Sequence, residues 1–205
     1  MRSLISLFTA FIMLLGFGGN CVYAEEQEVD VLELRLDENI ATPAVPKKAK
    51  QYVVATMDNL RRHLNKNGFN AKSMRQGEVL KIVIQASDLF SPCSVELKPS
   101  VKDKFRSLGV VTREPSNYKL IVAVHTDDTG DSVYADSISA ARANAIDDIL
   151  WEMAGEIDTN VIPYGIGKDE PIDKNTSRQG RAVNRRVEMY IVPDKGLLRL
   201  AGVKI

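Results

Sequence analysis

The sequence predicts an α+β fold in which helices pack on a mixed β-sheet. From Val79 onward, short apolar runs typical of strands alternate with longer segments whose apolar residues recur at helical spacing. The chain of 205 residues shows no internal repeat and no long proline-rich linker. These observations favour one main domain with terminal extensions.

Each element of this fold has its own signal. We expect strands over residues 79–86, 120–124, 161–166 and 187–192, and helices over 98–108 and 135–154. Leu80, Ile82 and Ile84 alternate on one side of the first strand. The second strand is almost unbroken apolar sequence, as expected for a strand covered on both faces. Pro163 weakens the third because it lacks an amide donor, and Gly155 ends the second helix.

The region before residue 79 predicts a leader and two further elements. An apolar run from Leu4 to Phe17 follows Arg2, and small Ala24 follows the pattern of a cleavage site, so residues 1–24 are interpreted as a secretory signal peptide. In the extension 25–46, the alternation of Leu32, Leu34 and Leu36 predicts a short strand.

An amphipathic helix is predicted over residues 47–65. Its apolar residues Val53, Met57, Leu60 and Leu64 fall on one face, and Asn67-Gly68 stops it. This face could dock an envelope protein or form a homodimer, or it could simply cap the sheet. The predicted organisation is a signal peptide (1–24), an extension (25–46), this helix with its connector (47–78), the main domain (79–193) and a C-terminal tail (194–205).

Charge and cysteine content narrow the function. Lys plus Arg and Asp plus Glu both number 27, so no overall field favours nucleic acid. After removal of the leader, Cys93 is the only thiol, which excludes an intrachain disulfide, and we expect it to be buried and inert. Membrane attachment is expected only through lipidation at Cys21 or through a partner.

Polar and glycine residues with distinctive spacing gather in four motifs. They are His125-Thr126-Asp127-Asp128-Thr129-Gly130, then Ile138-Ser139-Ala140-Ala141-Arg142-Ala143, then Gly165-Ile166-Gly167 with Pro171, and finally Asn175 with Gly180-Arg181-Ala182-Val183-Asn184-Arg185-Arg186-Val187-Glu188. Their order and spacing resemble those of the OmpA-like peptidoglycan-binding domain, over about residues 79–192. The resemblance implies a β-α-β-α-β-β two-layer sandwich with the helices on one face.

The resemblance also implies a ligand and a site. In that family, the acid of the first motif binds the ammonium of diaminopimelate in the peptidoglycan stem peptide, and the arginine of the second binds its carboxylate. The matching residues are Asp127 and Arg142. The implied function is noncatalytic anchoring of an envelope protein or complex to the cell wall, in the periplasm or at the outer membrane. The alternative is a structural or interaction protein that does not bind peptidoglycan.

The residue types support this assignment independently. A zwitterionic end group needs one anion and one forked cation nearby, and a guanidinium can bind a carboxylate through two parallel bonds. We expect Arg142 near a helix N-terminus, where the helix dipole favours a ligand carboxylate. The competing interpretation is an ordinary ion pair between Asp127 and Arg142.

The family comparison completes the candidate ligand-binding set. It adds Thr126, Thr129 and Phe90. It also adds Ala135 and Ser91, which depart from the family pattern: the family usually has Asn at the position of Ala135, and Asp or Asn at that of Ser91. The neighbours Arg185 and Arg186 should point to opposite faces of the last strand, and the resemblance places Arg185 on the pocket side. A basic sheet edge that discourages aggregation is the alternative for this pair.

Catalysis is not supported by the sequence. His125, Asp127 and Asp128 suggest a metal site, but no third ligand segment has persuasive spacing. No G-x-S-x-G motif is present, and Gly165-Ile166-Gly167 lacks the rest of a phosphate loop, so these glycines are expected in a tight turn against the pocket. We therefore expect a binding protein without a cofactor.

Overall fold

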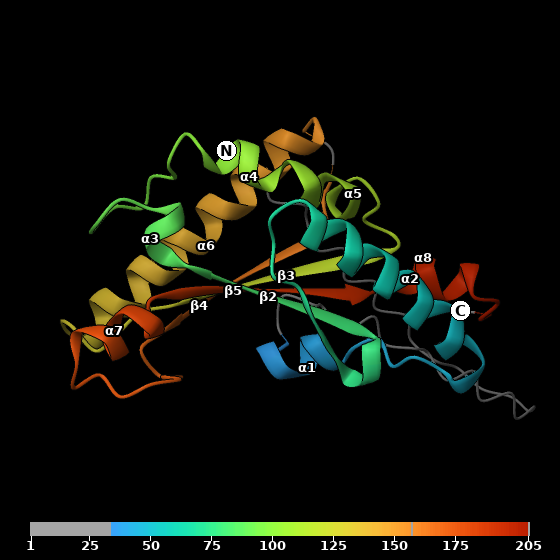
Figure 1. Ribbon diagram of the computed structural model, residues 1–205, viewed down its shortest axis with the longest axis horizontal. Helices are drawn as coiled ribbons and strands as arrows, with labels where there is room; N and C mark the ends of the chain where they lie inside the picture. The colour runs from blue at the N-terminus through green and yellow to red at the C-terminus, as the bar shows by residue number, and fades with distance from the viewer. Residues whose placement is uncertain (1–33, 157, 205) are drawn as a thin grey trace, which may run out of the picture.

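The computed structural model describes residues 34–156 and 158–204. The predicted signal peptide, Cys21 and Leu32 lie outside these residues. A five-stranded sheet in the order β1-β2-β5-β3-β4 forms the centre of the molecule (Figure 1). The strands are β1 (Lys72–Met74), β2 (Val79–Gln85), β3 (Tyr118–His125), β4 (Val161–Gly167) and β5 (Arg186–Pro193).

The sheet is mixed, as the sequence predicts. Strands β3 and β4 are parallel, and every other neighbouring pair is antiparallel. The last strand, β5, inserts between β2 and β3, and all residues of β3 and β5 are buried. Strand β4 lies at an edge, which is the position that tolerates Pro163.

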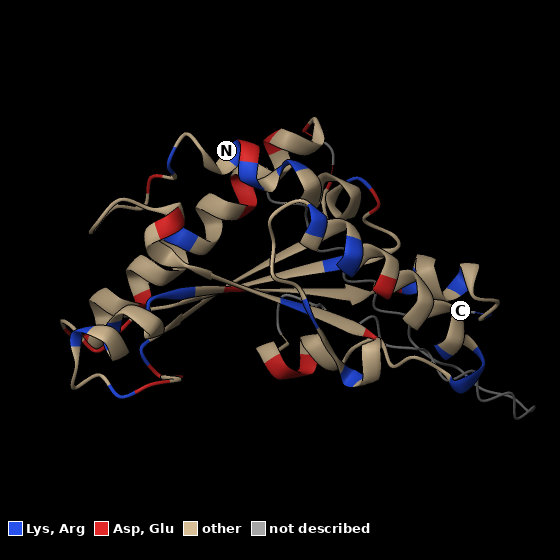
Figure 2. Cartoon of the chain, in the orientation of Figure 1, with Lys and Arg blue, Asp and Glu red and all other residues tan. Residues whose placement is uncertain are grey.

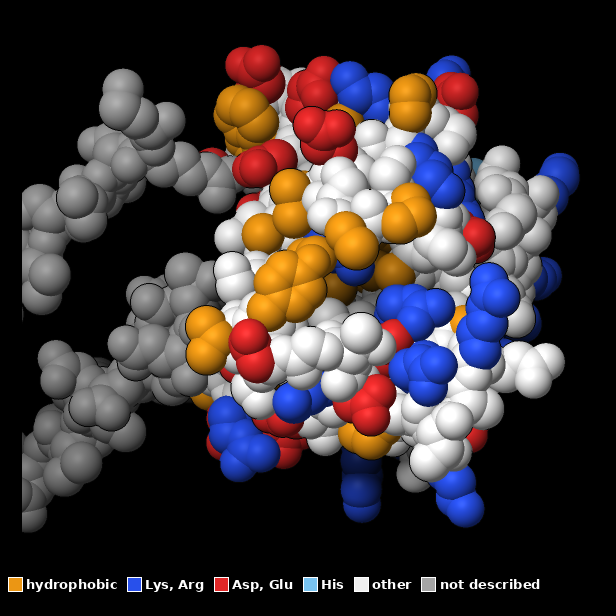
Figure 3. All heavy atoms as spheres, turned by 90° about the vertical axis from the view of Figure 1, so that its left-hand side faces the viewer, with side chains coloured by type: hydrophobic (Ala, Val, Ile, Leu, Met, Phe, Trp, Pro, Cys, Tyr) orange, Lys and Arg blue, Asp and Glu red, His pale blue; other side chains and the backbone are white. Residues whose placement is uncertain are grey.

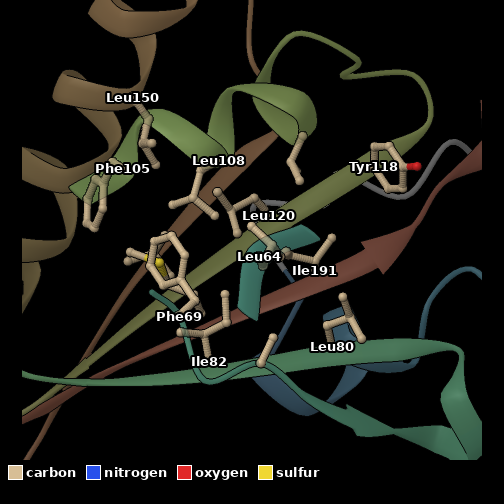
Figure 4. Close-up of a cluster of buried hydrophobic side chains, with 14 of the residues drawn as sticks. Leu64, Phe69, Leu80, Ile82, Phe105, Leu108, Tyr118, Leu120, Leu150 and Ile191 are labelled. Atoms are coloured by element: carbon tan, nitrogen blue, oxygen red, sulfur yellow. The ribbon is translucent and has the colours of Figure 1, made fainter. Parts of the chain in front are cut away.

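Most helices pack on one face of this sheet. They are α2 (Lys47–Lys66), α4 (Val101–Phe105), α5 (Gly109–Thr112), α6 (Ser132–Ala154) and α8 (Lys195–Leu200). Leu80, Ile82 and Ile84 of β2 point to this face and are buried, which confirms the predicted alternation. Figure 4 shows Leu64 of α2 close to Leu120 and Ile191 of the sheet, and Leu150 of α6 close to Phe105.

The apolar face of α2 is part of that core. Val53, Met57 and Leu64 have no exposed surface and Leu60 has 6%. The helix ends at Lys66, with Asn67 as its C-cap before Gly68, whose φ is +90°. The helix therefore caps the sheet. The interpretation of residues 47–65 as a docking or homodimer surface is wrong for this face, because the chain itself covers it.

The opposite face of the sheet is also partly covered, contrary to the expectation of helices on one face. Helix α1 (Leu36–Ala41) packs there, through Leu36 and Ile40, against Ile121 and Tyr190 (Figure 1). The predicted strand through Leu36 is wrong. Acidic residues in the first turn favour a helix, and the Glu38 carboxylate accepts a bond from the Arg35 amide at 3.0 Å.

The predicted helix over residues 98–108 also differs. It begins at Val101, continues through a 3₁₀ turn (Arg106–Leu108) and ends with α5. Pro99 explains the later start, because a residue that precedes proline is displaced from the helical region, which excludes Lys98. The sequence analysis missed three short helices, α3 (Ala86–Leu89), α7 (Arg178–Asn184) and α8, and the short strand β1.

Acidic and basic side chains are interspersed over helices and loops (Figure 2). Within residues 34–156 and 158–204, no helix has both the length and the hydropathy needed to cross a membrane.

Candidate ligand-binding pocket

A cavity of about 480 Å³ opens at the end of the sheet where strand β2 terminates and strand β5 begins. The eight predicted ligand-binding residues all line it: Phe90, Ser91, Thr126, Asp127, Thr129, Ala135, Arg142 and Arg185. Figure 3 views the molecule from this end and shows hydrophobic side chains gathered around a hollow that contains basic side chains. The structure thus brings together residues that are far apart in the chain.

Asp127 lies in the loop after β3 and supplies the acid of the pocket. Its side chain is 93% buried; one carboxylate oxygen accepts a hydrogen bond from the Thr129 amide at 2.9 Å, and the other pairs with the guanidinium of Arg185. Burial alone would raise the pKa of Asp127, but these bonds more than compensate, so its pKa lies below the usual value. The carboxylate is therefore charged at neutral pH.

Arg142 projects from α6 into the same cavity. Its Nε donates to the Ser94 carbonyl oxygen at 2.9 Å, and its guanidinium lies 4.9 Å from the centroid of the Phe90 ring. Arg142 is only 7% exposed, and burial lowers its pKa without neutralising it. These contacts hold the guanidinium in place.

Two expectations about Arg142 are wrong. Helix α6 begins at Ser132 rather than near 135, so Arg142 lies ten residues along it, about 15 Å from the N-terminus and beyond the reach of the helix dipole. The ion pair proposed between Asp127 and Arg142 is also not formed, since Asp127 pairs with Arg185 instead. Arg142 has no carboxylate partner among the residues that the structure describes.

Arg185 and Arg186 point to opposite faces, as predicted. Arg185 lines the pocket, whereas Arg186 is 2% exposed and its Nε donates to Glu188 at 2.7 Å. The alternative interpretation as a basic sheet edge is wrong, because β5 lies between two other strands.

Two glycines fix the position of α6 and of the loop that carries Asp127. A side chain on Gly165 would lie 2.4 Å from the Ala140 backbone nitrogen, so helix and strand can approach only because Gly165 has none. Gly167, with φ +62°, accepts a bond from the Thr126 amide at 2.7 Å and donates to the Ser139 hydroxyl at 3.0 Å. These glycines thus pack against α6. They do not line the cavity, so the predicted turn against the pocket is not formed by them.

The cavity wall includes residues that the sequence analysis missed. Tyr134 and Ile138 contribute apolar surface from α6, Lys98 adds a cation, and Cys93 lines the rim. Cys93 is exposed, which contradicts the expectation of a buried thiol. Its φ of +53° places it in a tight turn after Phe90, in which the Ser94 amide donates to the Ser91 carbonyl at 3.2 Å. Ser91-Pro92 is a sequence signal for this turn, because proline favours its second position.

The residues suggested for a metal site do not converge. His125 is 1% exposed on the opposite face of the sheet, 3.8 Å from Glu188. Burial, assisted by Arg186, lowers the pKa of His125 to about 4. Within the described part of the chain, no group of three His, Cys, Asp or Glu side chains is arranged to hold a metal ion.

Comparison with known proteins assigns this domain. A model of the OmpA family matches residues 89–185, a segment that carries the Asp127, Arg142 and Arg185 positions. These residues form an OmpA-like domain. A protein named as the lipoprotein YfiB from Escherichia coli (strain K12) is 33% identical over 104 residues, which are 50% of this chain and 64% of that protein. Outer membrane porin F from Pseudomonas aeruginosa is 41% identical over 114 residues, 56% of this chain and 32% of the porin.

Solved structures share the fold. A MotB-like protein from Desulfovibrio vulgaris aligns with a TM-score of 0.59 at 22% identity, over 70% of this chain and 98% of that chain. The cell wall anchor of the T6SS from Pseudomonas aeruginosa aligns with a TM-score of 0.56 at 22% identity, over 66% of this chain and 97% of that chain. These likenesses confirm the predicted α+β class.

The chain spans less than two thirds of the length of these curated relatives. They are an outer-membrane porin and a protein named as a lipoprotein, and neither is named as an enzyme. The predicted localisation, an exported protein of the periplasm, cell wall or outer membrane, agrees with these relatives.

Both departures from the usual OmpA family pattern lie at the pocket. Ala135 is 1% exposed and contributes only a methyl group to the wall, and Ser91 is exposed at the rim. The charged residues that line the pocket are thus Lys98, Asp127, Arg142 and Arg185.

Proposed function

We propose that the chain binds peptidoglycan through the diaminopimelate of the stem peptide and so anchors an envelope protein or complex to the cell wall, without catalysis. One observation carries the proposal: Asp127 and Arg142 line the same cavity with opposite charges and are not paired with each other. Their separation leaves room for a ligand that carries both charges.

The end group of diaminopimelate matches these two side chains. Its ammonium can bind the Asp127 carboxylate, and its carboxylate can accept bonds from Arg142, which lines the cavity. Each charge-assisted bond is worth about 1.5 to 3 kcal/mol net, so either residue is essential to a weak complex. Many such contacts along one polymer would add up to stable anchoring.

The partners that we propose follow from this role. One related structure is described as a cell wall anchor, and the present chain would act similarly for an envelope protein or complex. We propose no nucleic-acid partner, because the charges of the chain balance. The alternative role, protein interaction without wall binding, loses its main support because the apolar face of α2 is buried.

Co-sedimentation of the full chain with purified peptidoglycan tests the proposal. Asp127→Asn and Arg142→Gln should each abolish sedimentation while the circular dichroism spectrum and melting temperature stay near those of the wild type. Asp128→Asn and Arg178→Gln are matched controls, because both residues are exposed and neither lines the cavity. Wild-type binding that survives in both pocket variants would contradict the proposed function.

A further inference from the structure

The acid of the pocket is already engaged without a ligand. The two oxygens of Asp127 are taken by the Thr129 amide and by the Arg185 guanidinium. Each oxygen can accept a second bond, but a ligand ammonium that takes the position of a present donor must displace it. The Thr129 amide belongs to the backbone of the same loop, so Arg185 is the group that can leave.

The burial of the pair shows which side chain is free to move. The Arg185 side chain is 44% exposed, whereas that of Asp127 is 7% exposed. The backbone of Arg185 is held separately, since its amide donates to Arg181 at 3.1 Å and its carbonyl accepts from Ala86 at 2.9 Å. The guanidinium can therefore swing toward solvent while the main chain stays in place.

Resting on the proposed function, we propose that Arg185 is a releasable counter-ion of Asp127 and that it makes the pocket select an end group carrying both an ammonium and a carboxylate. Arg142 cannot play this role, because Ser94 and Phe90 hold its guanidinium in a nearly buried position. The two arginines thus have different tasks: Arg142 is a fixed receptor, and Arg185 is a competitor for the acid.

The charges explain the selectivity. An amine without a carboxylate would displace Arg185 and neutralise Asp127, which leaves two mutually repelling guanidiniums in one pocket without an anion of their own. A zwitterionic end group displaces Arg185 too, but its carboxylate then lies beside Arg142 and offers Arg185 a new partner. The exchange keeps every charge compensated only for the second kind of ligand.

NMR titrations of the full chain with two small ligands test this role. The ligands are meso-diaminopimelate and 1,5-diaminopentane, which has the same two ammonium groups and no carboxylates. We expect the wild type to prefer diaminopimelate strongly. In Arg185→Met, which keeps the apolar stem and loses the charge, the affinity for diaminopentane should rise about tenfold, or about 1.4 kcal/mol. Arg185→Lys should keep most of the preference.

Arg178→Met is the matched control, because it removes the same charge from α7 at an exposed position outside the cavity. Its ligand preference should equal that of the wild type. Diaminopentane affinity that is unchanged or lower in Arg185→Met would overturn the counter-ion role. Failure of the wild type to bind diaminopimelate would instead contradict the proposed function, and the diaminopentane titration would still decide whether Arg185 guards Asp127.

Discussion

Arg185 and Arg186 are neighbours in the chain, yet they belong to two clusters of opposite character. Arg185 reaches the open pocket, where its only carboxylate partner in the described structure is Asp127 and where Arg142 has none. Arg186 enters a closed cluster on the other face of the sheet, in which Glu188 binds Arg186, Lys81 and Tyr190. Both clusters contain buried carboxylates and guanidiniums.

The two clusters differ in whether each charged side chain has a buried counter-ion. In the closed cluster, Glu188 meets three donors, and these contacts outweigh its burial and lower its pKa to about 2. In the pocket, a cavity separates the fixed guanidinium of Arg142 from the acid, and the remaining counter-ion is half exposed. Buried charge thus indicates a ligand site only where its compensation is incomplete and solvent or ligand can enter.

The largest predicted effect comes from breaking the closed cluster. Glu188→Ala would leave Arg186 buried without its carboxylate, and we expect a loss of about 3 to 5 kcal/mol in the free energy of unfolding, measured by urea denaturation. Glu170→Ala is the control, because only the backbone oxygen of Glu170 contacts Arg186. A loss below about 1 kcal/mol would show that the cluster is not a closed, compensated unit.

Acid should destabilise the same cluster before it affects the pocket. The pKa of His125 is about 4 in the folded chain against 6.5 when unfolded, so the unfolded state binds the proton first and stability falls as pH drops from about 6.5 to 4. The lowered pKa of Glu188 adds a second loss from about 4.5 to 2. The His125 contribution is roughly 3 kcal/mol.

Urea denaturation at a series of pH values measures this loss. In His125→Gln the slope between pH 6.5 and 4 should largely disappear, whereas His63→Gln, on the exposed side of α2, should keep it. An unchanged slope in His125→Gln would assign the acid sensitivity to other groups.

A probe attached to Cys93 should affect only the open pocket. Because the thiol is exposed and lines the cavity, a bulky maleimide would obstruct the approach to Arg142 and weaken peptidoglycan binding at least tenfold. The free energy of unfolding should change by no more than about 0.5 kcal/mol, as for other surface changes. Mass spectrometry identifies the labelled residue, and Cys93→Ser treated with the same reagent should bind normally. Full binding by the labelled protein would place the ligand elsewhere.

Local sequence patterns predict the structural features that depend only on neighbouring residues. The alternation in β2, the apolar run of β3 and the opposite directions of Arg185 and Arg186 follow from strand geometry. The start of α6 could also be predicted from the sequence, because Asp131 is a residue type that commonly caps helices. In the structure its carboxylate accepts a hydrogen bond from the Tyr134 amide at 2.7 Å.

Other features depend on tertiary contacts that no local pattern contains. Three alternating leucines were too few to separate a strand from α1, which is positioned by the sheet beneath it. The pairing of Arg185 with Asp127 joins residues 58 positions apart. The family motifs therefore identify the members of the pocket but not which of them are already paired.

The smallest predicted effect concerns Ala135, where the pocket differs from the usual family pattern. Its methyl group faces the cavity, so the amide of Ala135→Asn has space to enter and to form one neutral hydrogen bond with the ligand. Such a bond is worth about 0.5 to 1.5 kcal/mol, and we expect an affinity for meso-diaminopimelate about threefold higher in NMR titrations. Ala135→Leu is the control, because the Leu side chain has nearly the shape of Asn but no polar atoms. This variant should bind the ligand no better than the wild type. If Asn and Leu weaken binding equally, the cavity beside Ala135 is needed for the ligand itself, and the open pocket is smaller than its lining residues imply.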